Sequence, residues 1–185
     1  MLIANDFEAQ EYLQHDLLPG EKLLWTGRPA TGIKLRTSDI FFIPFSILWF
    51  GFAIFWEAGV LSGGPSFFAI WGIPFICVGF YVTIGRFFYD KKMREKTVYG
   101  ITPDRIIINS GVFTTTVESF NIRILSNISI DEKSDGSGTI KLGSNDHPWG
   151  ELAIGGWRGN KKIPALEFIQ NVRNVYNLIL QQQKG

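Results

Sequence analysis

The sequence predicts two transmembrane helices followed by an antiparallel β-domain that ends in an amphipathic helix. Two charge-free runs lie close together in the first half of the 185-residue chain, and short runs rich in β-branched residues follow them. Near the C-terminus, apolar residues recur at three- and four-residue intervals, which is the spacing of a helix with one buried face. The net charge of +1 averages over these unlike parts and says nothing about partners.

A hydrophobic block extends from Ile40 to Gly85, and Glu57 is the only charged residue in it. It contains two charge-free runs, Ile40 to Trp56 and Phe67 to Ile84, each near the length that a helix needs to cross about 30 Å of hydrocarbon. Both runs therefore predict transmembrane helices. Two buried core helices are the alternative, but a soluble domain of this size rarely buries two such runs in succession.

Lysine and arginine predict the orientation of these spans. Basic residues flank the pair on both sides, and the connecting segment from Glu57 to Pro65 has none. The flanking residues are Arg28, Lys34 and Arg36 before the first span and Arg86, Lys91, Lys92, Arg94 and Lys96 after the second. We therefore expect a multi-pass protein of the cytoplasmic membrane, anchored in the lipid bilayer, with both termini in the cytoplasm.

Two glycines predict how the spans pack. Gly72 and Gly79 lie seven residues apart on one face of the second span, where the first helix can approach closely. We favour packing over a gate at this face, because the spans carry no histidine, paired charge or buried carboxylate of the kind that marks an ion path. Cys77 lies mid-span among apolar residues, where its thiol is expected to be unreactive.

The N-terminal segment predicts a short helix and a strand. From Asp6 to Leu17 the apolar residues have loosely helical spacing, and Pro19 with Gly20 ends the helix. Its polar positions are acidic and would be repelled by anionic lipid, so we favour docking on the protein's own domain over the membrane surface. The strand-like segment from Leu23 to Thr26 is expected to join the C-terminal sheet.

The second half of the chain predicts an antiparallel meander. Arg86 to Lys96 is expected to extend the second span as a helix, and the turn at Pro103 and Asp104 then joins the first two strands. The predicted strands are Thr97 to Ile101, Arg105 to Ile108, Thr114 to Ile122, Leu125 to Asp131, Thr139 to Leu142 and Glu151 to Ile154. Pro164 to Gln182 is predicted to form the closing amphipathic helix.

A curved antiparallel sheet of about six or seven strands, with one helix covering an open end, is the pleckstrin-homology (PH) type of architecture. The segments "LLPGEKLLWTGRP" (Leu17 to Pro29), "YGITPDRIIINSG" (Tyr99 to Gly111) and "VRNVYNLIL" (Val172 to Leu180) resemble the bacterial PH-like domain proteins that carry a membrane hairpin. The resemblance covers nearly the whole chain. Its residues are mostly turn and core positions, so it implies the fold and no particular ligand.

This organisation predicts three parts. Residues 1–37 form an N-terminal cytoplasmic helix and strand, residues 38–88 form a two-helix transmembrane hairpin, and residues 89–185 form a cytoplasmic PH-like domain with its C-terminal helix.

Two groups of residues are candidates for contact with a protein partner or with anionic lipid. The first is the irregular segment from Ser144 to Lys162, because loops carry function more often than scaffolds do. Its candidate residues are Trp149, Trp157, Arg158, Lys161 and Lys162. The second group is Lys91, Lys92 and Arg94, whose basic side chains would each contribute about 1 kcal/mol beside anionic headgroups. Simpler explanations are favoured for both: Trp157 packs under the terminal helix, and the basic residues only set topology.

The residues of the sequence do not support a catalytic function. No Ser, His and Asp set is suggested, no glycine-rich phosphate loop opens a helix, and no carboxylate pair stands out. His15 and His147 lack a Cys or carboxylate at ligand spacing. We therefore predict a protein that is not an enzyme, with no metal, no cofactor and no nucleic-acid partner.

Two functions remain. The first is a membrane-tethered interaction module or scaffold whose PH-like domain binds a protein segment or anionic lipid, through an exposed sheet edge or the loop around Trp157. The second is a structural or accessory subunit that assembles a membrane complex or homo-oligomer through Gly72 and Gly79. Replacing these two glycines with leucine would abolish association only under the second function.

Overall fold

The computed structural model describes residues 7–32, 35, 39–64, 67–143 and 164–184 of the chain. Contacts between residues divide the chain into two compact units. One unit, which we call the β-unit, comprises residues 1–31 and 92–185, and the other, the helical hairpin, comprises residues 32–91. The helical hairpin is thus an insertion within the sequence of the β-unit.

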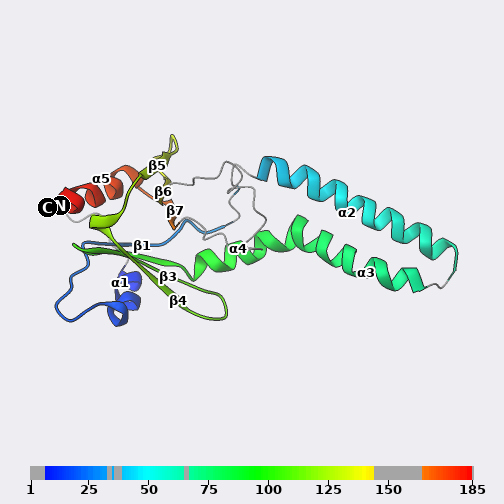
Figure 1. The fold of residues 1–185 in the computed structure, drawn as a ribbon, viewed down its shortest axis with the longest axis horizontal. Coiled ribbons are helices and arrows are strands. Elements are labelled where there is room, and N and C mark those ends of the chain that lie inside the picture. The colour runs from blue at the N-terminus through cyan, green and yellow to red at the C-terminus, as the bar shows by residue number, and fades with distance from the viewer. Residues whose placement is uncertain (1–6, 33–34, 36–38, 65–66, 144–163, 185) are drawn as a thin grey trace. The chain divides into compact units, whose positions relative to one another are not determined.

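The described part of the β-unit contains seven strands in two antiparallel sheets (Figure 1). The first sheet has the order β1-β2-β3-β4, and the second has the order β5-β6-β7. The strands are β1 (Trp25–Gly27), β2 (Val98–Ile101), β3 (Arg105–Ser110), β4 (Thr116–Asn121), β5 (Ile128–Glu132), β6 (Gly138–Leu142) and β7 (Ala165–Ile169). The predicted antiparallel meander is confirmed, and the predicted strand from Glu151 to Ile154 lies outside the described residues.

Helices occur in both units. The α-helices are α1 (Phe7–Leu13), α2 (Asp39–Ser62), α3 (Phe67–Phe80), α4 (Arg86–Glu95) and α5 (Val172–Lys184). Short 3-10 helices cover Gln14–Asp16 and Ile122–Ile124, and a π-helical turn, Tyr81–Gly85, joins α3 to α4 without a break. This continuity confirms that the second hydrophobic run extends as a helix through the basic segment.

Strand β1 belongs to the first sheet although the helical hairpin separates it from β2 in sequence. The register places Trp25 opposite Ile101, and the backbone N–H of Leu24 donates to the carbonyl of Ile101 over 2.8 Å. The expectation that the N-terminal strand joins the C-terminal sheet is therefore confirmed.

The main core of the β-unit combines side chains from both sheets and from α5. Val172, Val175 and Ile179 of α5 are fully buried and belong to the same cluster as Ile106 and Ile140. Burying an aliphatic side chain of this size stabilises a fold by about 1.5–3 kcal/mol. The amphipathic pattern of the C-terminal helix thus fixes how it covers the sheets.

The closing helix is shorter than predicted, because residues 165–169 form strand β7. Leu166 and Ile169 are buried at helical spacing, three residues apart. In β7 they reach the same face because the pairing with β6 is irregular, with Leu166 opposite Ile140 and Ile169 opposite Gly138. Because of this bulge, the buried residues of the strand have the three-residue spacing that is typical of a helix. Asn171, at a positive φ of 50°, separates the strand from α5.

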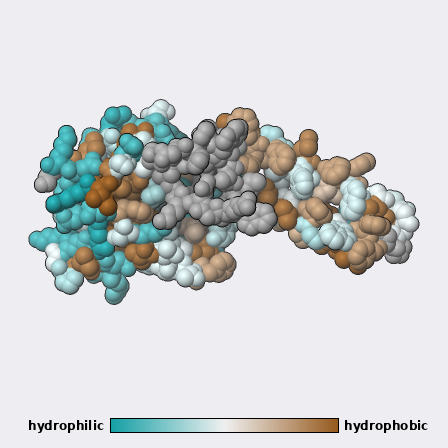
Figure 2. All heavy atoms as spheres, viewed as in Figure 1, coloured by the Kyte–Doolittle hydropathy of each residue, from teal (hydrophilic) through white to brown (hydrophobic). Residues whose placement is uncertain are grey.

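The helical hairpin exposes apolar side chains over most of its surface. Helix α2 and the continuous helix Phe67–Glu95 are each long and apolar enough to cross a membrane, by length and composition. Only 17% and 11% of their most apolar windows are buried, whereas a core helix of a soluble protein is mostly buried. Figure 2 shows this apolar surface along the two helices.

Glu57 lies inside a helix, and its expected place in the connection between the spans was wrong. Helix α2 continues to Ser62, because no helix-ending signal precedes Gly63 and Gly64, where Gly64 adopts a positive φ of 97°. The Glu57 side chain is buried against α3, and its Oε2 occupies the space that a β-carbon on Gly72 would need. The hydrophobic block therefore does contain a buried carboxylate.

Helix α1 docks on the face of the first sheet opposite the main core. Ala9 and Leu13 are fully buried and pack with Val98 and Ile107 (Figure 1). The predicted docking of this helix on the protein's own domain is thus confirmed.

The docking of α1 requires Gly100 in β2. A β-carbon there would lie 2.8 Å from Cδ1 of Leu13 and 3.0 Å from Cδ2 of Leu23. We expect Gly100→Val to weaken this docking by about 1–3 kcal/mol, which is the usual cost of overpacking. Limited proteolysis within α1 should accelerate, whereas Ser129→Val at an exposed strand position should leave it unchanged. Equal cleavage rates in both variants would contradict this prediction.

Candidate interaction surface

Strand β4 is the most exposed strand of the first sheet. All its residues are exposed except Phe120, which is half-buried against the main core. One side of β4 pairs with β3 along its whole length, and no strand in the described part of the chain pairs with the other side. We call this unpaired side the β4 edge. An unpaired edge presents backbone donors and acceptors that another extended segment can use.

The loop before β4 adds an exposed aromatic side chain to the β4 edge. Residues 111–115 form a tight uncharged turn, and a β-carbon on Gly111 would lie only 1.9 Å from the carbonyl oxygen of Thr114. Phe113 at its tip is 93% exposed. The loop, Arg28 and Lys96 line a pocket of about 340 Å³. The loop at this end of the β4 edge thus presents an aromatic ring and borders a pocket that is lined by two basic residues and one acidic residue, Glu95.

The second sheet has an edge at β5, but α5 lies beside it. Arg173 of α5 donates from Nε to Oε2 of Glu132 over 2.8 Å. Its Nη2 bonds to the same oxygen. A segment that extended the sheet at this end of β5 would therefore meet the helix. The β4 edge is the more accessible of the two.

A polar cluster fastens the segment after α1 to β3. Arg105 donates from Nε and Nη2 to the two carboxylate oxygens of Glu21, over 2.8 and 2.6 Å, and from Nη2 to the carbonyl of Asp16 over 2.9 Å. The hydrogen bonds from Arg105 to Glu21 lower the pKa of Glu21 from 4.5 to about 2, while burial opposes the shift. Arg105, the first residue of the predicted strand Arg105 to Ile108, is thus a structural anchor.

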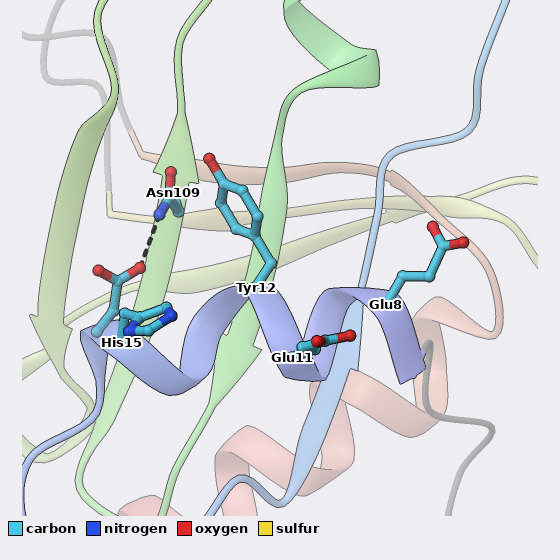
Figure 3. A pocket seen from close by; sticks show the side chains of 6 residues that line it. Glu8, Glu11, Tyr12, His15 and Asn109 are labelled. Atoms are coloured by element: carbon cyan, nitrogen blue, oxygen red, sulfur yellow. Dashed lines mark hydrogen bonds between the residues drawn. The ribbon is translucent and has the colours of Figure 1, made fainter.

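A pocket of about 470 Å³ lies between α1 and β3 (Figure 3). It is lined by Glu8, Glu11, Tyr12, His15, Asp16 and Asn109. Asn109 of β3 is buried, and its Nδ2 donates to Oδ2 of Asp16 over 2.7 Å. In the part of the chain that the structure describes, no group of three or more His, Cys, Asp and Glu side chains is arranged to hold a metal ion.

The candidate contact residues of the sequence fall in different places. Trp149, Trp157, Arg158, Lys161 and Lys162 lie outside the described residues. Lys91 and Lys92 are exposed, as a headgroup contact requires. Arg94 is buried with 5% exposure, and its guanidinium lies 5.6 Å from the ring centre of Phe168. The first two stay predicted contacts, whereas Arg94 lies in the packing of the β-unit.

Gly72 and Gly79 both face α2 within the same hairpin. A β-carbon on Gly79 would lie 2.7 Å from the Phe50 ring and 3.2 Å from its Cα. The corresponding space at Gly72 is filled by Glu57. The glycines thus permit a close approach of two helices of one chain. Their replacement would test this internal packing before it tested association between proteins.

The β4 edge and the pocket beside Asn109 could not be located from the sequence. Strand β4 was predicted, but its position at the end of a sheet depends on the order of all strands. Asp16 and Asn109 are 93 residues apart, and nothing in their local sequences joins them. The adjacent polar residues Glu118 and Ser119, which point to opposite faces of a strand, were the one available signal of exposure on both faces.

Two packed antiparallel sheets closed by a C-terminal helix define a PH-like domain. The sequence model of the family described as "Bacterial PH domain" matches residues 41–182, which is well over half of the chain. The chain therefore belongs to this bacterial PH domain family. No significant match was found among curated proteins or among solved structures. PH-like domains are generally interaction modules without catalytic activity.

Proposed function

We propose that this protein is a membrane-tethered interaction module that binds an extended segment of a partner protein along the β4 edge. The observation that carries the proposal is the exposure of β4 on both faces and along one side. Strand addition uses such an edge, because main-chain hydrogen bonds give affinity and alternate side chains give specificity.

The membrane part of the proposal is supported by the helical hairpin. Its two helices are long and apolar enough to span a bilayer and are little buried. Strand β1 before them pairs with β2 after them, so both flanks must lie on one side of any membrane that the hairpin crosses. The distribution of lysine and arginine supports the cytoplasm as that side, and the proposal places the hairpin in the bacterial inner membrane.

Two other functions are less well supported. A structural subunit assembled through Gly72 and Gly79 would need a surface that α2 already covers in the same chain. Recognition of anionic headgroups by Lys91 and Lys92 remains an alternative, and the basic groups near Phe113 fit it as well. Strand addition is preferred because all six residues of β4 lie on a strand whose outer side is unpaired in the described part of the chain.

Site-specific photocross-linking in the native membrane tests the proposal. A photoreactive amino acid is placed at each of residues 116–121 in turn, and at Ser129 and Asp131 of β5 as controls. We expect residues of β4 to cross-link to one protein. When the photoreactive position moves by one residue along β4, the cross-linked residue of the partner should also move by one. Such a register is the signature of paired strands.

Three outcomes would contradict strand addition. Cross-links to lipid alone would assign the surface to headgroup recognition. Equal yields from β4 and β5 would indicate unspecific contact, and a fixed partner residue for all positions would indicate a contact that is not a strand. As a second check, Val117→Lys should abolish cross-linking from Ser119, because lysine on an edge strand opposes pairing, whereas Ser129→Lys should not.

A further inference from the structure

We infer that the pocket between α1 and β3 is a binding site for an ammonium or guanidinium group. A lysine or arginine side chain of the segment on the β4 edge supplies this group, and that part of the inference rests on the proposed function. Three features of the pocket carry it: an unsatisfied acceptor, a surplus of carboxylates and an aromatic ring beside them (Figure 3).

The unsatisfied acceptor is Oδ1 of Asn109. The side chain is 3% exposed, and its Nδ2 faces Oδ2 of Asp16. A carboxylate only accepts hydrogen bonds, so this contact fixes which end of the amide is which. Oδ1 is left buried without a donor in the described part of the chain. A buried acceptor without a donor is costly, and a ligand with N–H groups would satisfy it.

The charges around this acceptor select a cation. The lining carries carboxylates at Glu8, Glu11 and Asp16, against one histidine. Glu8 pairs with Arg28 over 3.5 Å, so Glu11 and Asp16 supply the surplus of negative charge. The arginine nearest in sequence to Asn109, Arg105, is held by both oxygens of Glu21 and is not part of the lining. The ring of Tyr12 completes the wall, and aromatic faces attract lysine and arginine groups. Ammonium and guanidinium groups carry only donors, which matches a wall of acceptors.

The pocket lies on the side of the sheet from which a segment on the β4 edge can reach it. Asn109 is paired with Val117 of β4, so both side chains share the face that α1 covers. An added strand would lie about 4.8 Å beyond β4. A long side chain of this strand, lying across Val117, would bring its charged end to Asn109 and Asp16. On the other face, exposed Glu118 favours a second basic residue.

The test measures binding of two eight-residue peptides to the full-length protein in a zwitterionic detergent. Both peptides alternate valine and threonine around one central residue, which is arginine in one and citrulline, its uncharged isostere, in the other. We expect the arginine peptide to bind about tenfold more tightly by fluorescence anisotropy, which corresponds to one charge-assisted hydrogen-bonded contact. The ratio should fall to about one in the double variant Glu11→Gln, Asp16→Asn.

Control variants separate folding from binding. Asp131→Asn, on β5, should preserve the tenfold ratio, and Glu11→Gln alone, at an exposed position, should reduce it without disturbing the fold. Hydrogen exchange of β3 amides reports whether the double variant keeps its sheet. In parallel, acetyl-arginine amide and acetyl-citrulline amide are added to isotope-labelled protein, and the side-chain amide resonances of Asn109 are followed.

Each outcome decides between the parts of the inference. Equal affinities for both peptides, with no shift of the Asn109 resonances, would overturn the cation site and leave strand addition intact. A shift with acetyl-arginine amide but no binding of either peptide would support the cation site and overturn its supply by an added strand. A tenfold ratio that survives the double variant would place the arginine elsewhere and overturn the site.

Discussion

Replacement of Gly79 by leucine will separate α2 from α3. The glycine faces the Cα of Phe50 at 3.2 Å from an added β-carbon, so backbone as well as side chain must move to admit a larger residue. The expected cost is about 2 kcal/mol or more, the range of overpacking. A cysteine pair at Ser46 and Thr83, whose side chain donates to the Ser46 carbonyl, reports the separation as a fall in disulfide yield.

Two matched variants serve as controls for this result. Gly51→Leu lies in α2, and a β-carbon there meets no atom within 4 Å, so the disulfide yield should be that of the parent. Gly72→Leu should have a smaller effect than Gly79→Leu, because the displaced atoms are the end of the flexible Glu57 side chain. A disulfide yield that falls equally in all three variants would show that the glycines do not set the contact. Cys77 is replaced by alanine throughout.

Replacement of Glu21 by glutamine will loosen the first sheet. The carboxylate accepts two hydrogen bonds from Arg105, and the two side chains are only 10% and 20% exposed. Breaking a largely buried ion pair costs about 3 kcal/mol, which is on the order of a hundredfold in the opening equilibrium. Hydrogen exchange of β3 amides in the full-length protein should accelerate accordingly. Arg123→Gln breaks an exposed pair with Asp104 and should change the exchange rate little.

The same ion pair predicts a pH dependence of known sign. The pKa of Glu21 is about 2 in the folded protein and 4.5 without its partners. A lowered pKa means that the pair stabilises the fold fully above about pH 4.5 and loses its contribution as the pH falls toward 2. The exchange rates of the parent and Glu21→Gln should therefore converge over this interval. Rates that converge on raising the pH instead would show that the pair has another role.

The elements of the fold were predictable where local sequence decides them. Runs of β-branched residues and the turns between them placed the strands, and uncharged length placed the two hydrophobic helices. The β1 pairing followed from the expectation that both termini lie on one side of the membrane. The exception, β7, shows the limit of periodicity, since Leu166 and Ile169 have the spacing of a helix, and the bulge in β7 that puts both on one face is defined only by pairing with β6, a separate segment.

The candidate site was less predictable, because it depends on residues that only the fold brings together. The exposure of β4 follows from its place at the end of the sheet. The acceptor at Asn109 follows from its contact with Asp16, whose carboxylate comes from the turn after α1. The burial of Glu57 depends on how far α2 continues, and a charge alone was taken as the end of the span. Counts of charged residues describe composition only. The exposure of β4, the contact of Asn109 and the burial of Glu57 depend on strand pairing, on the docking of distant segments and on helix length.

The insertion of the helical hairpin between β1 and β2 has a consequence for biosynthesis. Strand β1 leaves the ribosome before both hydrophobic helices, and its partner β2 follows them. The pair of Trp25 and Ile101 can therefore form only after both helices have been synthesised. If only one of the helices entered the bilayer, the two strands would be on opposite sides and the sheet could not close. In a membrane that the hairpin crosses, completion of the sheet would therefore exclude chains in which only one of the two helices has entered the bilayer.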